Sequence, residues 1–283
     1  MTDTSADAWR AVAPMPRDRA EAMADAIFED GLAETASAHE TDAGWCVELM
    51  FEHEPDLAGL PDTDWTIEPM QQSDWVSKSL AGLHPVRAGR FVVHGGHDRG
   101  RVPAGAIGIE VEAGLAFGTG HHGTTWGCLV ALDRLLRGGR PDVALDLGCG
   151  SGVLAIALAK ATLGGPLVLA SDIDADSVRI TRENAALNRV PQRIEAVEAA
   201  GLAHPTLRAN APYDLVMANI LAAPLKAMAP EIRRAVAPGG RLVLSGLLAH
   251  QEAMVRNAYL AQGFRHLFRV PSGGWMTLVL ERP

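Results

Sequence analysis

From residue 142 onward, short apolar runs alternate with segments of helical periodicity. The runs typical of buried strands are Val143–Leu147, Leu167–Ser171, Arg193–Val197, Tyr213–Ala218 and Arg241–Ser245. Helical patterns separate or follow them at Leu154–Ala161, Asp174–Asn188, Ala222–Ala235 and His250–Ala261. Such alternation produces an α/β fold in which a parallel sheet carries helices on both faces. A hairpin expected at His266–Val270 and Trp275–Leu280 completes a mostly parallel seven-stranded sheet with an antiparallel C-terminal part.

The N-terminal region has a different pattern. It predicts strands at Ala8–Val12, Leu32–Ala38, Trp45–Phe51 and Trp65–Met70, with a helix at Arg19–Phe28 and a short helical segment at Pro55–Pro61. This order is that of a split βαβ, ferredoxin-like unit. We therefore expect a small α+β domain over residues 1–70, a linker helix and turn over 71–90, and a larger domain over 91–283.

Charge is distributed unevenly along the chain, which has a formal net charge of −9. Residues 1–95 hold 18 acidic and 6 basic residues, whereas residues 96–283 hold 16 and 19. The acidic part is either a docking surface for a basic partner or a solubilising face. The acidic balance argues against a protein that neutralises nucleic-acid phosphates along its whole surface.

The three cysteines, Cys46, Cys128 and Cys149, are far apart and form no C-x-x-C pair. This pattern favours neither a disulfide framework nor a zinc ribbon. The adjacent His121 and His122 point apart in most backbones, so no metal site is expected there. No signal peptide and no apolar stretch of ~20 residues are evident. We expect a cytoplasmic protein that does not contact a membrane.

The sequence Asp146-Leu-Gly-Cys-Gly-Ser-Gly152 lies between an expected strand and an expected helix. Glycines at such a turn allow a ligand to approach the backbone, and the helix N-terminus offers free N–H groups. Position 153 is Val, so the dinucleotide fingerprint G-x-G-x-x-G is not fulfilled, and no phosphate loop is present. Gly148 and Gly150 therefore mark a binding turn for a ligand other than a dinucleotide.

Two further polar positions follow expected strands. Asp172 can accept hydrogen bonds from both hydroxyls of a ribose, whereas Asp174 opens a helix and is expected to cap it. Asn219 begins Asn-Ile-Leu-Ala-Ala-Pro224, and its amide oxygen can accept from an amine. Because the carboxyl ends of parallel strands bind ligands, these residues are expected to share one site.

A fourth block, Gly114–Thr125, precedes a helix expected at Trp126–Leu136. Thr124 or Thr125 is expected to cap that helix or to hold a ligand carboxylate.

Together with Pro238–Gly246, these blocks resemble the PrmA family, the methyltransferases of large-subunit ribosomal protein eleven. The resemblance implies a Rossmann-like class I methyltransferase domain and S-adenosyl-L-methionine as cofactor. It assigns a catalytic role to Asn219. The cofactor-binding residues that it implies are Phe117, Thr124, Thr125, Gly148, Gly150, Asp172, Ile173 and Asn219.

The resemblance also implies a reaction. Methyl groups would pass to lysine ε-amino groups and to the N-terminal α-amino group of ribosomal protein eleven. The enzyme would be a monomer that recognises this protein through residues 1–70, without contacting nucleic acid directly. Two alternatives remain open: methylation of another substrate, such as a lysine of a different protein, or a non-enzymatic ribosome-assembly module. A nucleic-acid amine is less favoured because Asn219 is not followed by Pro-Pro-Tyr.

Overall fold

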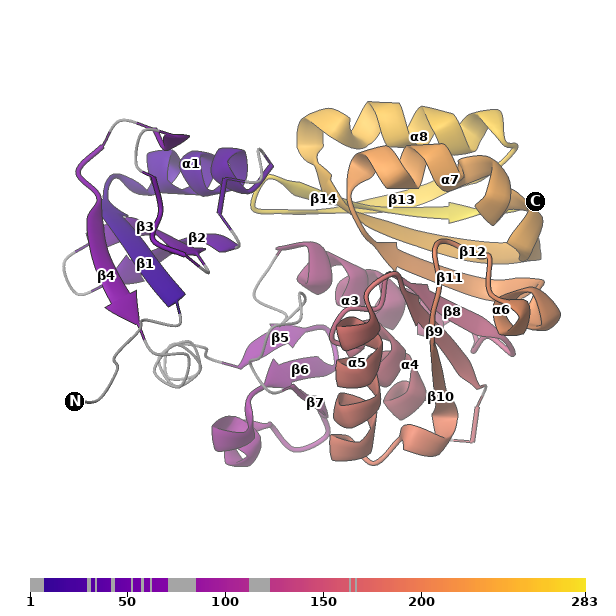
Figure 1. The fold of residues 1–283 in the computed structure, drawn as a ribbon. Coiled ribbons are helices and arrows are strands. Elements are labelled where there is room, and N and C mark those ends of the chain that lie inside the picture. Colours follow the sequence, from indigo (N-terminus) through magenta and orange to yellow (C-terminus); the bar gives the residue numbers. More distant parts are fainter. Residues whose placement is uncertain are drawn as a thin grey trace. The chain divides into compact units, whose positions relative to one another are not determined.

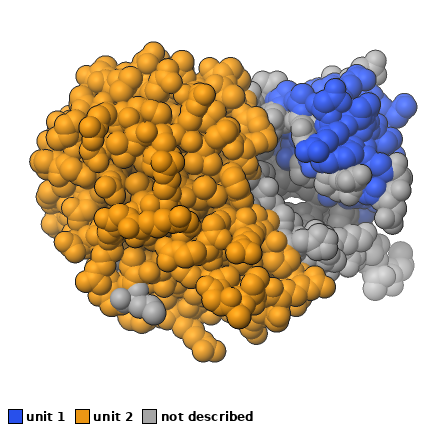
Figure 2. All heavy atoms as spheres, turned by 180° about the vertical axis from the view of Figure 1, so that it is seen from behind, with its two compact units in different colours: residues 1–82 blue, residues 83–283 orange. Residues whose placement is uncertain are grey.

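The computed structural model divides the chain into two compact units, residues 1–82 and 83–283 (Figure 2). The structure describes residues 8–283 except 30, 31, 34, 42, 43, 52, 57, 58, 62, 71–84, 112–122, 163 and 166. No helix in the described part of the chain is long and apolar enough to cross a membrane.

The first unit is an antiparallel sheet packed against one described helix. Its elements are β1 (Ala8–Pro14), α1 (Arg17–Glu29), β2 (Thr35–Thr41), β3 (Gly44–Phe51) and β4 (Thr66–Met70). The strand order β2-β3-β1-β4 is that of a split βαβ unit, since β3 lies between the two strands that α1 connects. β2 begins three residues later than expected. The short helix expected at Pro55–Pro61 lies partly outside the described residues.

The second unit is built on the expected seven-stranded sheet (Figure 1). Its strands are β8 (Ala144–Leu147), β9 (Val168–Asp172), β10 (Ile194–Glu198), β11 (Tyr213–Asn219), β12 (Val236–Leu248), β13 (Arg265–Ser272) and β14 (Trp275–Glu281). Their order is β10-β9-β8-β11-β12-β14-β13, and β14 alone runs in the direction opposite to the other six strands. The C-terminal hairpin therefore provides the antiparallel part of the sheet, as the sequence predicts.

Helices cover both faces of this sheet. They are α3 (Gly123–Leu136), α4 (Val153–Ala161), α5 (Ala175–Leu187), α6 (Pro205–Asn210), α7 (Ala222–Ala235) and α8 (Glu252–Ala261). The first three pack into one apolar core and the last three into another, while successive strand residues alternate between the two. In β11, for example, Met217 faces the first core and Val216 the second. Burial on both faces explains why the strands are almost continuously apolar.

A small three-stranded sheet precedes the large one. It contains β5 (Val86–Ala88), β6 (Phe91–His94) and β7 (Ile107–Glu110), and β6 pairs antiparallel with β5 and parallel with β7. Asn188 attaches this sheet to α5, because its side chain accepts from the Glu110 N–H (2.9 Å) and donates to the Glu110 carbonyl (2.5 Å). β5 lies within residues 71–90, of which 71–84 are outside the described residues.

Candidate active site

The glycine turn connects β8 to α4 at the carboxyl ends of the strands. The N–H groups of Gly148 and Cys149 donate to the Ser171 carbonyl at 2.7 and 3.0 Å, which fixes the turn to β9. Gly148 has φ +73°, and a Cβ there would lie 2.2 Å from Cγ2 of Ile220. Glycine is required for both reasons. The turn therefore lies directly beside the segment that follows β11.

Asp172 holds the same turn from the end of β9. Its Oδ2 accepts from the Gly150 N–H at 2.9 Å, and its Oδ1 accepts from the Asp174 N–H at 3.1 Å. A carboxylate has about four acceptor positions, so lone pairs remain for ligand hydroxyls. Asp174 caps α5 as expected, since its side chain accepts from the N–H groups of Asp176 and Ser177.

Asn219, the last residue of β11, presents an acceptor that has no partner in the described part of the chain. Its Nδ2 donates to Oγ1 of Thr125 at 3.4 Å, across 94 residues of sequence. Its Oδ1 is buried and has no hydrogen-bond partner among the described residues. A buried acceptor without a donor costs free energy. The Thr125 contact thus engages the amide nitrogen, and within the described part of the chain it leaves the oxygen without a donor.

The first turn of α3 holds Thr125 in place. The helix begins at Gly123, so Thr124 and Thr125 belong to its first turn, and both side chains are buried. The expectation that one of them caps the helix is therefore wrong. The Ser245 hydroxyl approaches the Thr124 carbonyl at 3.3 Å and Oγ1 of Thr277 at 2.8 Å. At Gly127 a Cβ would lie only 2.3 Å from Oγ1 of Thr277. This close packing fixes α3 against β12 and β14.

Asp146 lies beneath the glycine turn with a side chain that is almost fully buried. Its Oδ2 accepts from the Ala155 N–H at 2.9 Å, whereas its Oδ1 has no partner among the described residues. Burial raises the pKa of Asp146 to about 8; the Ala155 N–H opposes this shift and the charge of Asp172 adds to it. At neutral pH the carboxyl group is therefore mostly protonated.

Two large apolar side chains are exposed at this edge of the sheet. Ile173 follows Asp172 and is 74% exposed, and Leu221 lies two residues after Asn219 and is 59% exposed. Ile173 was expected to bind cofactor, whereas Ile220 and Leu221 were not identified as functional from the sequence. The sequence held one signal for Ile220: a glycine such as Gly148 in a turn indicates that another residue packs closely against it. The expected site residue Phe117 lies outside the described residues.

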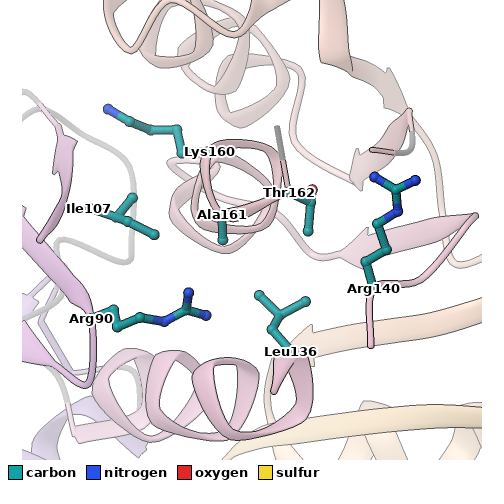
Figure 3. A pocket seen from close by; sticks show the side chains of 7 residues that line it. All are labelled: Arg90, Ile107, Leu136, Arg140, Lys160, Ala161 and Thr162. Atoms are coloured by element: carbon teal, nitrogen blue, oxygen red, sulfur yellow. The ribbon is translucent and has the colours of Figure 1, made fainter. Parts of the chain in front are cut away.

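A cavity of about 500 Å³ lies elsewhere in this unit (Figure 3). It is lined by Arg90, Ile107, Leu136, Arg140, Lys160, Ala161 and Thr162. Leu136 ends α3 and Ala161 ends α4, which places the cavity at the amino ends of the strands, away from the glycine turn. Among the described residues no group of His, Cys, Asp or Glu side chains could hold a metal ion, and His121 and His122 are not described.

Comparisons with known proteins point to one family. A family model described as ribosomal protein L11 methyltransferase (PrmA) matches residues 17–283. A ribosomal protein L11 methyltransferase of Caulobacter sp. (strain K31) is 44% identical over 283 residues, covering 96% of this chain and 97% of that protein. One from Rhodopseudomonas palustris (strain BisB5) is 48% identical over 266 residues, covering 90% of each. The crystal structure of a ribosomal protein L11 methylase from Lactobacillus delbrueckii subsp. bulgaricus aligns with a TM-score of 0.63 at 29% identity, covering 71% of this chain and 99% of that one.

The sheet order and the glycine turn between β8 and α4 define a class I methyltransferase. Enzymes of this class transfer a methyl group from S-adenosylmethionine. Within the class, the chain belongs to the ribosomal protein L11 methyltransferase (PrmA) family.

Proposed function

We propose that this chain transfers methyl groups from S-adenosyl-L-methionine to lysine ε-amino groups and to the N-terminal α-amino group of ribosomal protein L11. The observation that carries the proposal is the buried Oδ1 of Asn219, which faces no donor among the described residues. Its amide nitrogen already bonds Thr125. The oxygen is thus available for an N–H group, as an amine substrate requires.

The residues at the carboxyl edge suit the cofactor. The turn at Gly148 and Gly150 has positive φ values, and its backbone offers a close approach that side chains would block. We assign the ribose hydroxyls to the free lone pairs of Asp172. We also assign Ile173, Phe117, Thr124 and Thr125 to the cofactor site, on the family resemblance. When bound, S-adenosylmethionine supplies an electrophilic methyl group.

Asn219 then orients the neutral, reactive form of the target amine. A free lysine has a pKa of about 10.4, so only about one in a few thousand is neutral at pH 7. Exclusion of water at the site favours the neutral amine. The Asn219 Oδ1 accepts one N–H of this amine and thereby fixes the direction of the nitrogen lone pair. Alignment of this kind contributes more to the rate than a strong base would.

The first unit is suited to hold a lysine-rich protein. Residues 1–82 contain 18 acidic and 4 basic residues. One of these basic residues, Arg10, is paired with Glu48 at 2.5 Å and with Glu68 at 3.4 Å. The excess negative charge would attract a cationic substrate over distances of about one Debye length.

The test is transfer of labelled methyl groups to recombinant L11, with mass spectrometry to locate them. We expect label on lysine and N-terminal amines of L11 and none on a basic control protein of similar charge. We also expect KM for L11 to rise with salt while cofactor affinity stays constant, because only docking depends on exposed charge. Absence of label on L11 would overturn the substrate assignment.

A further inference from the structure

Six large apolar side chains are exposed among the described residues, and two of them have a clearly larger exposed fraction than the other four. They are Leu32, Leu167, Ile173, Leu221, Met254 and Leu260. Ile173 and Leu221 are 74% and 59% exposed, whereas the other four lie between 39% and 42%. Both follow a polar site residue at the carboxyl edge of the sheet. A single exposed leucine needs no explanation, but Leu221 also occupies a special backbone position.

Leu221 is the N-cap of α7, where its side chain makes no capping hydrogen bond. Leucine is among the least favourable residues at an N-cap, and Ser, Thr, Asp and Asn are preferred. The neighbouring helix α5 provides a comparison, because its N-cap Asp174 lies two residues after Asp172 just as Leu221 lies two residues after Asn219. Asp174 bonds two N–H groups of its helix. The chain thus uses an apolar residue at the one cap next to Asn219.

This position suits the methylene groups of a lysine substrate. An ε-amine that reaches the Asn219 Oδ1 brings four methylene groups with it, and these must lie just outside the acceptor. An exposed leucine two residues further along the same segment offers an apolar surface there. We infer that Leu221 contacts the aliphatic stem of the target lysine and thereby makes the enzyme favour ε-amines over α-amines. This inference rests on the proposed function.

The inference predicts unequal effects on the two kinds of amine. An N-terminal α-amine lacks the four-methylene stem, so its methylation does not depend on contact with Leu221. Loss of the leucine side chain should therefore slow lysine methylation selectively. A merely structural role of Leu221 would affect both amines equally, because both use the same cofactor and Asn219.

The experiment compares wild type with Leu221→Ser on full-length L11 at a subsaturating concentration, with site-resolved mass spectrometry of the two amines in one reaction. We expect the initial rate at lysines to fall about tenfold, while the rate at the α-amine stays within about twofold. The melting temperature should stay constant or rise, since serine provides a helix cap. Leu221→Met, which keeps an apolar surface, should restore lysine methylation.

The matched control is Leu167→Ser, which removes a leucine of 42% exposure just before β9, at the opposite edge of the same sheet. It should leave both rates unchanged. Equal loss at both amines, no loss at either, or the same loss in Leu167→Ser would overturn the role of Leu221. If wild-type protein labels neither amine of L11, while calorimetry still detects S-adenosylmethionine binding, the proposed substrate fails and the inference fails with it.

Discussion

The two edges of the seven-stranded sheet differ in how their polar groups are used. At the amino edge, Asp214 accepts from the N–H groups of Asp142 and Val143 at 2.9 and 3.0 Å. Asn210 donates to the Thr206 carbonyl at 2.9 Å. At the carboxyl edge, by contrast, buried oxygens of Asp146, Ser171 and Asn219 have no partner among the described residues. These unpaired oxygens lie on three adjacent strands, whereas the buried side-chain atoms without a hydrogen-bond partner at the amino edge are nitrogens, of Arg241, His266 and Arg282, again counting only the described residues.

The cavity lies at the amino edge, and several of the polar side chains that line it bond other protein groups. Figure 3 shows the Lys160 ammonium turned away from the space between Ala161 and Leu136. It donates instead to Oδ1 of Asn188 at 3.0 Å, and Arg90 bonds Asp133 at 2.5 Å. Cations at helix C-termini also stabilise the helix dipole. The cavity lined by Arg90 and Lys160 is therefore weaker evidence for a ligand-binding site than the unpaired oxygen of Asn219 near the glycine turn.

The largest effect is expected when one asparagine at each edge of the sheet is replaced by alanine. Asn219→Ala should lower kcat for L11 methylation about 100-fold, because the amine loses the group that aligns it. Asn210→Ala, at the amino edge, should leave kcat unchanged. Steady-state kinetics with labelled cofactor measures both. A similar loss in the two variants would remove the functional distinction between the edges.

The second comparison concerns the two carboxylates Asp172 and Asp214. Asp172→Ala should weaken S-adenosylmethionine binding by about 2 kcal/mol, since it removes acceptors for the ribose. Asp214→Ala removes two backbone hydrogen bonds at the other edge and should reduce stability without changing affinity. Isothermal titration calorimetry gives the affinities. Unchanged affinity in Asp172→Ala would rule out the ribose contact.

A third prediction concerns the protonation of Asp146. Its pKa of about 8 in the folded chain exceeds the ordinary value of about 3.9 for an unfolded one, so the folded state binds more protons between these pH values. The contribution of Asp146 to stability is therefore complete below pH 4 and is lost as pH rises toward 8.

The variant Asp146→Asn cannot titrate and isolates this effect. Urea unfolding without cofactor should show that the stability advantage of wild type over this variant shrinks between pH 5 and 8. The decrease is limited to about 1.4 kcal/mol per pH unit for one proton. A constant difference across this range would contradict the raised pKa.

The smallest effect is expected at Asp174, which caps α5 but lies outside the assigned ligand contacts. Asp174→Ala should lower the melting temperature by about 2–4 °C through loss of the cap. Cofactor affinity should not change. Thermal unfolding and calorimetry on the same sample separate the two. Weaker cofactor binding in this variant would extend the site beyond Asp172 and Ile173.

Most strands and helices of the second unit were predictable, because periodicity and turn residues are local signals. The helix α6 was missed, since its N-cap is His204, whose ring accepts from the Thr206 N–H, and histidine is not a usual cap. β12 begins at Val236 rather than Arg241. Its early part depends on pairing with Arg282, which lies far away in sequence.

The sequence predicted where the residues of the candidate site lie, but not which hydrogen bonds they make. Asp172 and Asn219 lie at the carboxyl ends of strands, and this alone places them at one edge. The contact between Asn219 and Thr125 could not be inferred, because it joins residues 94 positions apart. Leu221 belongs to the Asn-Ile-Leu motif but was given no role of its own, because a leucine at a helix cap becomes informative only once the start of α7 is known.

The two cores on opposite faces of the sheet have a consequence for how such an enzyme can change over evolutionary time. α4, which follows the glycine turn, is buried in one core, and α7, which follows Asn219, is buried in the other. Mutations that repack one helix leave the packing of the other largely undisturbed. Substitutions that change affinity for the methyl donor and substitutions that change the choice of target can accordingly accumulate independently of each other.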